Sequence, residues 1–254
     1  GEFFSEIVRG MDRETSARGY HLLLSNMHAD AGLAAQAMRS MRGRVDGLIV
    51  MAPQVDPDGL DEALPRGVPA VLVNSPGDGT RPAFRINNAA GIEAVVRHLV
   101  AGGRRALAHV AGPAGNLDAR ERRDGFLAAM ARHLPGVEPV IVGGDFHEES
   151  GARALADLRG RGVALDGVVA ANDMMALGML GALREAGVAV PGAVAVTGFD
   201  DVPLARYLGL TTVRVPLAEL GARAITRLVE AIEGSAPSTD TEVIATTLVI
   251  RATT

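Results

Sequence analysis

The chain has 254 residues, of which 48% are hydrophobic and 22% are charged, a composition typical of a globular protein with apolar material for one large or two medium domains. Its formal net charge of −5 argues against the basic face that nucleic acid or an anionic membrane would need. The sequence contains no Cys, which excludes disulfides and cysteine nucleophiles, and no Lys, which excludes Schiff-base chemistry and a P-loop lysine.

No apolar run reaches the roughly 20 residues of a membrane span, because Arg, Asp, Gly or Pro interrupts each one. The first residues, GEFFSEIVRG, carry acids and lack the basic region followed by an apolar stretch that begins a signal peptide. These features predict a cytoplasmic location. The chain does not begin with Met, which indicates a fragment.

Helical and strand patterns alternate in the first part of the chain. Phe4, Ile7, Val8 and Met11 follow the i, i+3, i+4, i+7 spacing of a helix, which Gly19 closes. Short apolar runs predict strands, and helical patterns separate them. The strands are expected at 21–26, 45–51, 68–74 and 84–87, and the helices near 33–41, 58–64 and 92–99.

The same alternation continues after Gly102 and Gly103. Strands are expected at 105–112, 138–145, 165–173 and 194–201, and helices at 119–133, 149–160 and 174–186. Strands that are apolar on both faces and separated by helices predict parallel sheets with helices on both sides. The segment VDGLIVMAP (45–53) is echoed by LDGVVAAND (165–173), which favours two similar lobes over one continuous sheet.

Enzyme motifs are missing from the sequence: GxGxxG, GxxxxGK[ST], GxSxG and HExxH do not occur. His28 and Asp30 have metal-like spacing, but without further ligands a polar loop is the better interpretation. His98 and His109 are expected to be buried, hydrogen-bonded imidazoles, and His147 to lie at the surface. No set of nucleophile, base and orienting residue can be assembled, so we expect no catalysis, no metal and no cofactor.

Polar residues follow the predicted strands, at the carboxyl ends where ligands bind in parallel sheets. Arg122 joins them, because an Arg early in a helix opposes the helix dipole and so suggests another partner. Asn, Asp and Arg together can bind hydroxyl groups. In the pairs Asn172-Asp173 and Asp200-Asp201, one member is free to cap the next element while the other faces the cleft. These residues are Ser25, Asn26, Asn74, Asn87, Asn88, Asn172, Asp173, Asp200 and Asp201.

An ordered set of segments resembles the effector-binding core of the lactose/galactose repressor (LacI/GalR) family of bacterial transcription regulators. The segments cover essentially the whole chain and include EFFSEIVRG, RVDGLIV, GVPAVLVN, GDFHEESG, ANDMMALGMLGALREAG, VAVTGFDD and LTTVRVP. The resemblance implies an α/β fold of two Rossmann-like lobes with parallel sheets, periplasmic-binding-protein-like of type I, joined by three crossovers. The lobes would be 1–103 plus 214–236 and 104–213 plus 237–254, with LTTVRVP crossing between them.

The resemblance also assigns roles to residues. Family members hydrogen-bond the effector at the positions of Arg122, Asn172 and Asp200, which leaves Asp201 to cap the turn over Val202–Arg206. An aromatic ring lines the pocket at Phe146. The remaining positions are Phe3 and Phe4, which match the first ligand loop, and Asn87, which replaces the usual Asp.

Two further departures from the family pattern concern the chain's course. The strand that should precede the Phe3-Phe4 segment is missing, and Tyr207-Leu208-Gly209 stands where the family commonly has Pro.

The resemblance implies a homodimeric effector domain that binds a sugar or polyol between its lobes. Operator DNA would be bound by a helix-turn-helix headpiece N-terminal to Gly1, not by this chain. A purine is the alternative effector, with Phe146 stacking on the base. A solute-binding protein of a sugar transporter is the second class of function, and a small-molecule enzyme is the least favoured.

Overall fold

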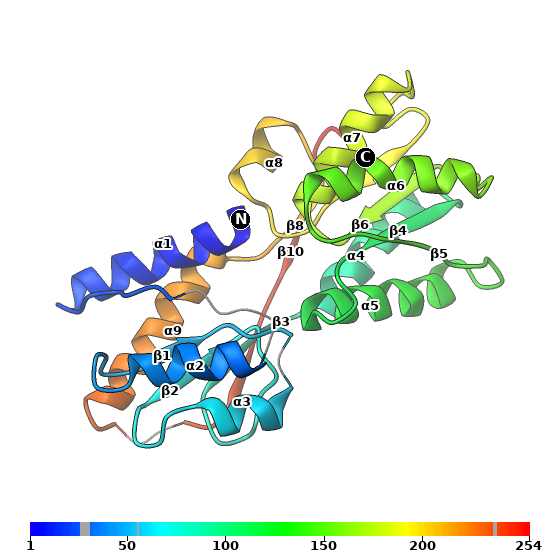
Figure 1. Cartoon of the computed structure of the whole chain (residues 1–254). Helices are drawn as coiled ribbons and strands as arrows, with labels where there is room; N and C mark the ends of the chain where they lie inside the picture. Colours follow the sequence, from blue (N-terminus) through cyan, green and yellow to red (C-terminus); the bar gives the residue numbers. More distant parts are fainter. Residues whose placement is uncertain (26–30, 55, 236–237) are drawn as a thin grey trace. The chain divides into compact units, whose positions relative to one another are not determined.

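The structure is a computed structural model that describes residues 1–25, 31–54, 56–235 and 238–254. These residues form two compact units, Gly1–Ile86 with Pro216–Ile244 and Asn87–Val215 with Ala245–Thr254. Each unit contains a parallel sheet flanked by helices (Figure 1). The predicted alternation of strands and helices in an α/β fold is therefore confirmed.

The first unit is built on a four-stranded parallel sheet in the order β1-β2-β3-β9. Helices α1 and α9 pack together so closely that a Cβ on Gly10 or Gly221 would meet the backbone of the opposite helix. The elements are α1 (Glu2–Ala17), α2 (Ala31–Met41), β1 (Leu48–Val50), α3 (Pro57–Ala63), β2 (Ala70–Val73), β3 (Ala83–Ile86), α9 (Leu217–Ile232) and β9 (Thr241–Ile244).

The strand predicted at 21–26 is wrong over the residues that the structure describes. Residues 21–25 have no regular secondary structure, and Leu23 and Leu24 are 60% and 61% exposed. A buried strand needs a neighbouring strand for its backbone N–H and C=O groups, and the sheet order of the described residues gives 21–25 no such neighbour. The apolar run alone does not supply one. Asn26, His28 and Asp30 lie outside the described residues.

The second unit contains a four-stranded parallel sheet in the order β5-β4-β6-β7 and an antiparallel pair, β8 with β10. The elements are α4 (Asn88–Ala101), β4 (Leu107–Ala111), α5 (Leu117–His133), β5 (Val140–Gly143), α6 (Glu148–Gly160), β6 (Gly167–Ala170), α7 (Asp173–Glu185), β7 (Ala195–Thr197), α8 (Pro203–Tyr207), β8 (Thr212–Arg214) and β10 (Thr247–Val249).

The bounds of the two units differ from the lobe bounds predicted from the sequence. Helix α4, predicted in the first lobe, belongs to the second unit because it packs against α5, β8 and β10. Strand β9, predicted in the second lobe, belongs to the first unit because it pairs with β3. The chain passes back to the first unit after Val215, directly after β8, which lies in the LTTVRVP segment.

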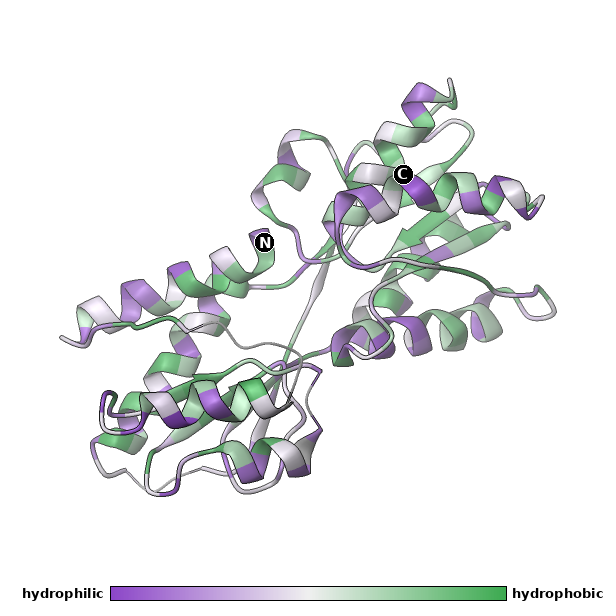
Figure 2. Cartoon of the chain, viewed as in Figure 1, coloured by the Kyte–Doolittle hydropathy of each residue, from purple (hydrophilic) through white to green (hydrophobic). Residues whose placement is uncertain are grey.

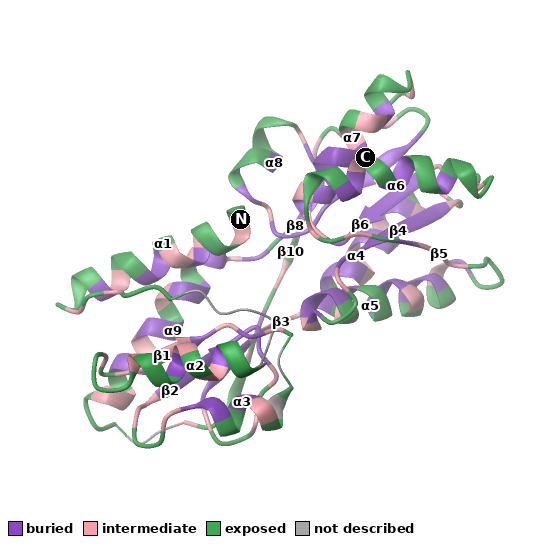
Figure 3. Ribbon diagram, viewed as in Figure 1, coloured by how far each residue is buried: buried purple, intermediate pink, exposed green. Residues whose placement is uncertain are grey.

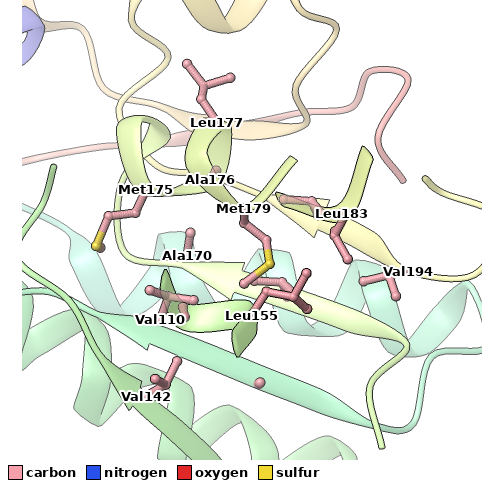
Figure 4. Close-up of a cluster of buried hydrophobic side chains, with 14 of the residues drawn as sticks. Val110, Val142, Leu155, Ala170, Met175, Ala176, Leu177, Met179, Leu183 and Val194 are labelled. Carbon is pink, nitrogen blue, oxygen red and sulfur yellow. The ribbon is translucent and has the colours of Figure 1, made fainter. Parts of the chain in front are cut away.

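The second unit's core lies on both faces of its sheet. Every residue of β4 and β6 is buried, and Figure 3 shows both strands in the colour of buried residues. Figure 2 shows that these strands are mostly hydrophobic. Figure 4 shows Met175 and Met179 of α7 near Ala170 and Val110 of the strands. Helix α6 approaches α7 so closely that a Cβ on Gly178 would lie 2.0 Å from the Glu148 carbonyl oxygen.

Asparagine residues are the N-caps of three helices of this unit. The Oδ1 atoms of Asn87, Asn116 and Asn172 accept hydrogen bonds from backbone N–H groups in the first turns of α4, α5 and α7. These caps satisfy N–H groups that a helix cannot bond itself. Among the described residues, none of the helices combines the length and the hydropathy that crossing a bilayer requires.

Candidate functional site

Arg122 of α5 is the centre of a buried polar cluster in the second unit. Its side chain is 3% exposed, and its Nε donates to Asn88 Oδ1 at 2.9 Å. Its Nη1 donates to the Ala171 carbonyl at 2.9 Å, and its Nη2 lies 3.4 Å from Asp200 Oδ1. The guanidinium stands 3.9 Å from the centre of the Phe199 ring, a cation–π contact. One arginine thus joins α4, α5 and the ends of β6 and β7.

Asn88 orients Arg122 from α4. While its Oδ1 accepts from Arg122, its Nδ2 donates to Asp118 Oδ1 at 2.8 Å and to Glu121 Oε1 at 3.0 Å. Asn88 is buried, so these bonds fix the direction of its amide group. The sequence marks Asn88 as a strand-end polar residue, but only its contacts show that it belongs to the Arg122 cluster.

Asp200 is buried beside Arg122, with 4% of its surface exposed and a φ of 111°. Burial raises the pKa of Asp200 to about 7, with Arg122 opposing the rise and Asp118 adding to it. Its backbone N–H donates to the Val213 carbonyl at 2.8 Å. Because its contact with Arg122 is long, at 3.4 Å, the Asp200 carboxyl keeps capacity for another hydrogen bond.

The expectation that Asp201 caps the turn over Val202–Arg206 is wrong. The N-cap of α8 is Val202, and no side chain caps it. Asp201 instead accepts from Arg214 Nε at 2.7 Å and pairs with Arg251 Nη1 at 2.8 Å. Burial raises the pKa of Asp201, but these two guanidinium groups outweigh it and hold the pKa below its ordinary value. Two arginines attract this carboxylate more strongly than a helix start does.

Asn172 and Asp173 follow β6, where one residue was expected to cap the next helix and the other to face the cleft. The structure gives them different roles. Asn172 caps α7 through its Oδ1, and its Nδ2 donates to the Phe146 carbonyl at 2.8 Å. Asp173 is buried, and its carboxylate accepts from Thr212 Oγ1 at 2.5 Å and from the Val202 N–H at 2.8 Å. Both ends of the Asn172 amide are therefore occupied by bonds within the chain. The effector contact assigned to Asn172 stays a prediction.

Phe146 lies directly over Gly112 at the end of β4. A Cβ on Gly112 would come within 2.5 Å of the Phe146 ring, so this contact needs glycine. Phe146 has a φ of 73° and is partly buried against the second unit's core, with its carbonyl held by Asn172. The structure thus joins Phe146 with Asn172, and Arg122 with Asp200.

The other predicted site residues have simpler surroundings. Asn87 caps α4, with Oδ1 accepting from the Ala90 N–H at 3.2 Å. Phe3 and Phe4 lie in the first turn of α1, not in a loop, and Phe4 is 44% exposed. These two phenylalanines belong to the first unit, whereas the five other predicted residues belong to the second.

Asn74, at the end of β2, is a candidate that the family resemblance did not single out. It is 2% exposed with a φ of 50°, and both its amide atoms are buried without a hydrogen-bond partner in the described part of the chain. A buried unsatisfied amide costs about 1–3 kcal/mol. The signal in the sequence is its position directly after the apolar run AVLV, which forms the fully buried strand β2.

A cavity of about 870 Å³ opens in the second unit at the ends of β4 and β5. Three arginines line it, Arg120, Arg123 and Arg153. Gly112, Gly143 and several residues of α5 and α6 also line it. None of the predicted site residues lines it.

His109 is a buried, hydrogen-bonded imidazole, as predicted. Its Nδ1 lies 2.7 Å from the Val169 carbonyl oxygen, and its ring stacks on Phe126 at 5.1 Å between centres. Burial lowers the pKa of His109 to about 4, so its ring is neutral at pH 7. Across the described residues, no three His, Cys, Asp or Glu side chains gather in a group suited to a metal ion.

Known proteins resemble the chain in sequence and in fold. Residues 96–254 match the family model described as periplasmic binding protein-like domain. The ribose operon repressor of Escherichia coli K12 is 34% identical over 239 residues, covering 91% of this chain and 72% of that repressor. The HTH-type transcriptional repressor PurR of Erwinia tasmaniensis is 34% identical over 265 residues, covering 98% and 75%.

A solved structure of the lac repressor bound to ONPG in its repressed state has a TM-score of 0.90 to this chain. The two are 26% identical, and the alignment covers 98% of this chain and 77% of the repressor. The fold is therefore that of a periplasmic-binding-protein-like ligand-binding domain. Within that class, the chain belongs to the LacI/GalR family of transcriptional regulators.

Proposed function

We propose that this chain is the effector-sensing region of a bacterial transcription regulator and that it binds a neutral sugar or polyol. The observation that carries the proposal is the buried pair of Arg122 and Asp200 at the carboxyl ends of the second unit's strands. A guanidinium donor and a carboxyl acceptor side by side suit adjacent hydroxyl groups, which accept from one and donate to the other. Each such charged hydrogen bond contributes about 1.5–3 kcal/mol.

The remaining predicted residues have supporting roles in this proposal. Phe146 offers an aromatic ring to the apolar face of a sugar, and Phe3 and Phe4 offer further apolar surface. Asn87 and Asn172 supply amide groups, although each already caps a helix. Asn74 adds an amide whose buried atoms have no partner among the described residues, so that an effector hydroxyl would relieve its cost.

Effector binding controls operator DNA in this proposal. The chain acts as a homodimer in the cytoplasm, and DNA is bound by a helix-turn-helix headpiece, not by this acidic chain. The effector shifts the protein between conformations only as far as it binds one of them more tightly. A 10-fold difference in affinity changes the ratio of the two conformations 10-fold, which is about 1.4 kcal/mol.

A purine effector is the second candidate, because the PurR repressor is as similar to this chain as the ribose operon repressor is. In that case Phe146 stacks on the base and Asp200 bonds a ring N–H. A solute-binding protein of a transporter shares the fold but is less favoured, because the relatives compared above are repressors. Catalysis is not proposed for the same reason.

A thermal-shift panel tests the proposal. The probes are D-ribose, D-galactose, hypoxanthine and guanine, added to the purified 254-residue chain. We expect a sugar to raise the melting temperature, because a ligand at 100 times its Kd stabilises the folded state by about 2.7 kcal/mol. Stabilisation by purines alone would select the second candidate, and no response to any probe would count against both effector classes.

An arginine variant ties the response to the site. Arg122→Gln should remove the shift, whereas Arg161→Gln, which breaks an exposed pair with Asp157 on α6, should leave it. An unchanged shift in Arg122→Gln would remove Arg122 from the binding site.

A further inference from the structure

Asp173 is a buried carboxylate that the proposed contacts with the effector do not use. It is the first residue of α7, and its side chain is fully enclosed. Both oxygens are occupied within the chain, because Oδ1 accepts from Thr212 Oγ1 and Oδ2 accepts from the Val202 N–H. It therefore has no oxygen turned toward a ligand, and its role must lie in what it holds.

Asp173 brackets the turn that carries Asp200. Its backbone N–H donates to the Phe199 carbonyl at 2.9 Å, before the turn, and its side chain accepts from the Val202 N–H at 2.8 Å, after the turn. Between these two bonds lie Asp200 and Asp201, with φ values of 111° and 58°. Non-glycine residues rarely adopt such angles, and they persist only where the surroundings determine them.

A glycine beside the turn marks how close Asp173 lies. A Cβ on Gly198 would come within 2.3 Å of Asp173 Oδ1, so no other residue fits there without moving the carboxylate. The close approach and the two bracketing bonds together specify the path of the chain from Gly198 to Val202.

The bond to Thr212 links the same carboxylate to β8. Thr212 begins β8, and the chain passes to the first unit after Val215. Two backbone bonds run parallel to this link, from the Asp200 N–H to the Val213 carbonyl and from the Val215 N–H to the Asp200 carbonyl. Asp173, the Asp200 turn and β8 are thus one hydrogen-bonded assembly.

We infer that Asp173 is a positioning residue that sets the Asp200 turn for effector binding and ties that turn to β8. The inference rests on the proposed function in one respect, namely that Asp200 contacts the effector. Through the assembly, a shift of the Asp200 carboxyl on binding is passed to the strand that precedes the crossing of the chain at Val215.

Four variants of the 254-residue chain test the inference. Asp173→Ala removes both side-chain bonds, and Thr212→Val removes only the bond to β8 while keeping the side chain's shape. Asp173→Asn keeps an acceptor for Val202 and offers Thr212 a donor. Thr197→Val is the matched control, since Thr197 is also a buried threonine, and its hydroxyl bonds the Val168 carbonyl.

The first measurement needs no ligand. Hydrogen exchange of the Asp200 and Val215 amides, neither of which bonds the Asp173 side chain, should accelerate about 10-fold in Thr212→Val and more in Asp173→Ala. The control Thr197→Val should leave their rates unchanged, and Asp173→Asn should restore them to within about threefold. Wild-type rates in both Asp173→Ala and Thr212→Val, or equal acceleration in the control, would overturn the inference.

The second measurement is calorimetric titration with D-ribose and D-galactose. Affinity should fall about 10-fold in Thr212→Val and about 30-fold or more in Asp173→Ala, and it should stay within about threefold in Asp173→Asn. Unchanged affinity in Thr212→Val, with the wild type binding, would contradict the positioning role. If the wild type binds neither sugar, the proposed sugar effector fails, while the exchange rates still decide the role of Asp173. Should Asp173→Ala not fold, Thr212→Val still decides it.

Discussion

We expect Asp200 to make the stability of the second unit depend on pH, and replacing it with Asn should remove the part of that dependence that comes from Asp200. Burial raises the pKa of Asp200 from 3.8 to about 7. The folded state therefore keeps this proton to a higher pH than the unfolded chain does. The contribution of the protonated carboxyl is complete below about pH 4 and is lost as the pH rises toward 7, the reverse of a carboxylate with a lowered pKa.

The size of the effect follows from the pKa difference. A shift of about 3 pKa units, at 1.36 kcal/mol for each, corresponds to a loss of about 4 kcal/mol between pH 4 and pH 8. Three charged groups face or influence this carboxyl: Arg122, Asp118 and Asp173. Burial and Asp200 together raise the pKa of Asp173 well above its ordinary value, so Asp173 adds a loss of the same sign that partly remains in Asp200→Asn.

Urea unfolding at pH 4.5 and pH 8 measures this prediction. The wild type should lose about 3 kcal/mol more than Asp200→Asn between these pH values, because part of the pH dependence lies below pH 4.5. Asp124→Asn, a change at an exposed residue of α5, should behave as the wild type does. A ¹³C NMR titration of the Asp200 carboxyl gives its pKa directly. Equal pH dependence in the wild type and Asp200→Asn, or an NMR pKa near 4, would refute the reasoning.

Two further predictions concern glycine and asparagine. Gly178→Ala should lower the free energy of unfolding by more than about 2 kcal/mol in urea melts, because its Cβ would lie 2.0 Å from the Glu148 carbonyl oxygen. On the same helix, a Cβ at Gly181 meets no atom within 4 Å, so Gly181→Ala should raise the free energy of unfolding by about 0.5–1 kcal/mol. Similar losses of stability in Gly178→Ala and Gly181→Ala would contradict the close packing at Gly178. Asn74→Gly tolerates the φ of 50° and removes the unsatisfied amide, so it should leave stability within about 1 kcal/mol while weakening sugar binding about 10-fold by calorimetry. Undiminished affinity would separate Asn74 from the effector.

The alternation of elements could be predicted from the sequence because it depends on local patterns. The runs around Val71 and Val168 are apolar at each position, which is typical of strands covered on both faces, and both lie in parallel sheets. The same reasoning failed at Leu23 and Leu24, because an apolar run contains no information about whether a neighbouring strand is present.

The site could be predicted in part. Arg122 and Asp200 were singled out by their positions early in a helix and after a strand, and then by the family resemblance, and the structure brings them into contact. The choice of Asp200 as the residue beside Arg122 was also predicted, but what Asp201 binds depended on residues distant in the sequence. Asp201 lies against Arg214 and Arg251, which no local pattern connects to it.

By itself the sequence determined the class of fold, the family and the strand ends that carry polar side chains, since periodicity and motif order are properties of neighbouring residues. Only the tertiary structure decided how those side chains are used. It bonded the Asn172 amide to the Phe146 carbonyl, placed Asn88 between Arg122 and Asp118, and enclosed Asp173 beneath the Asp200 turn. Burial and these hydrogen bonds depend on segments that lie far apart in the sequence, as Asn88 and Asp118 do at a separation of 30 residues.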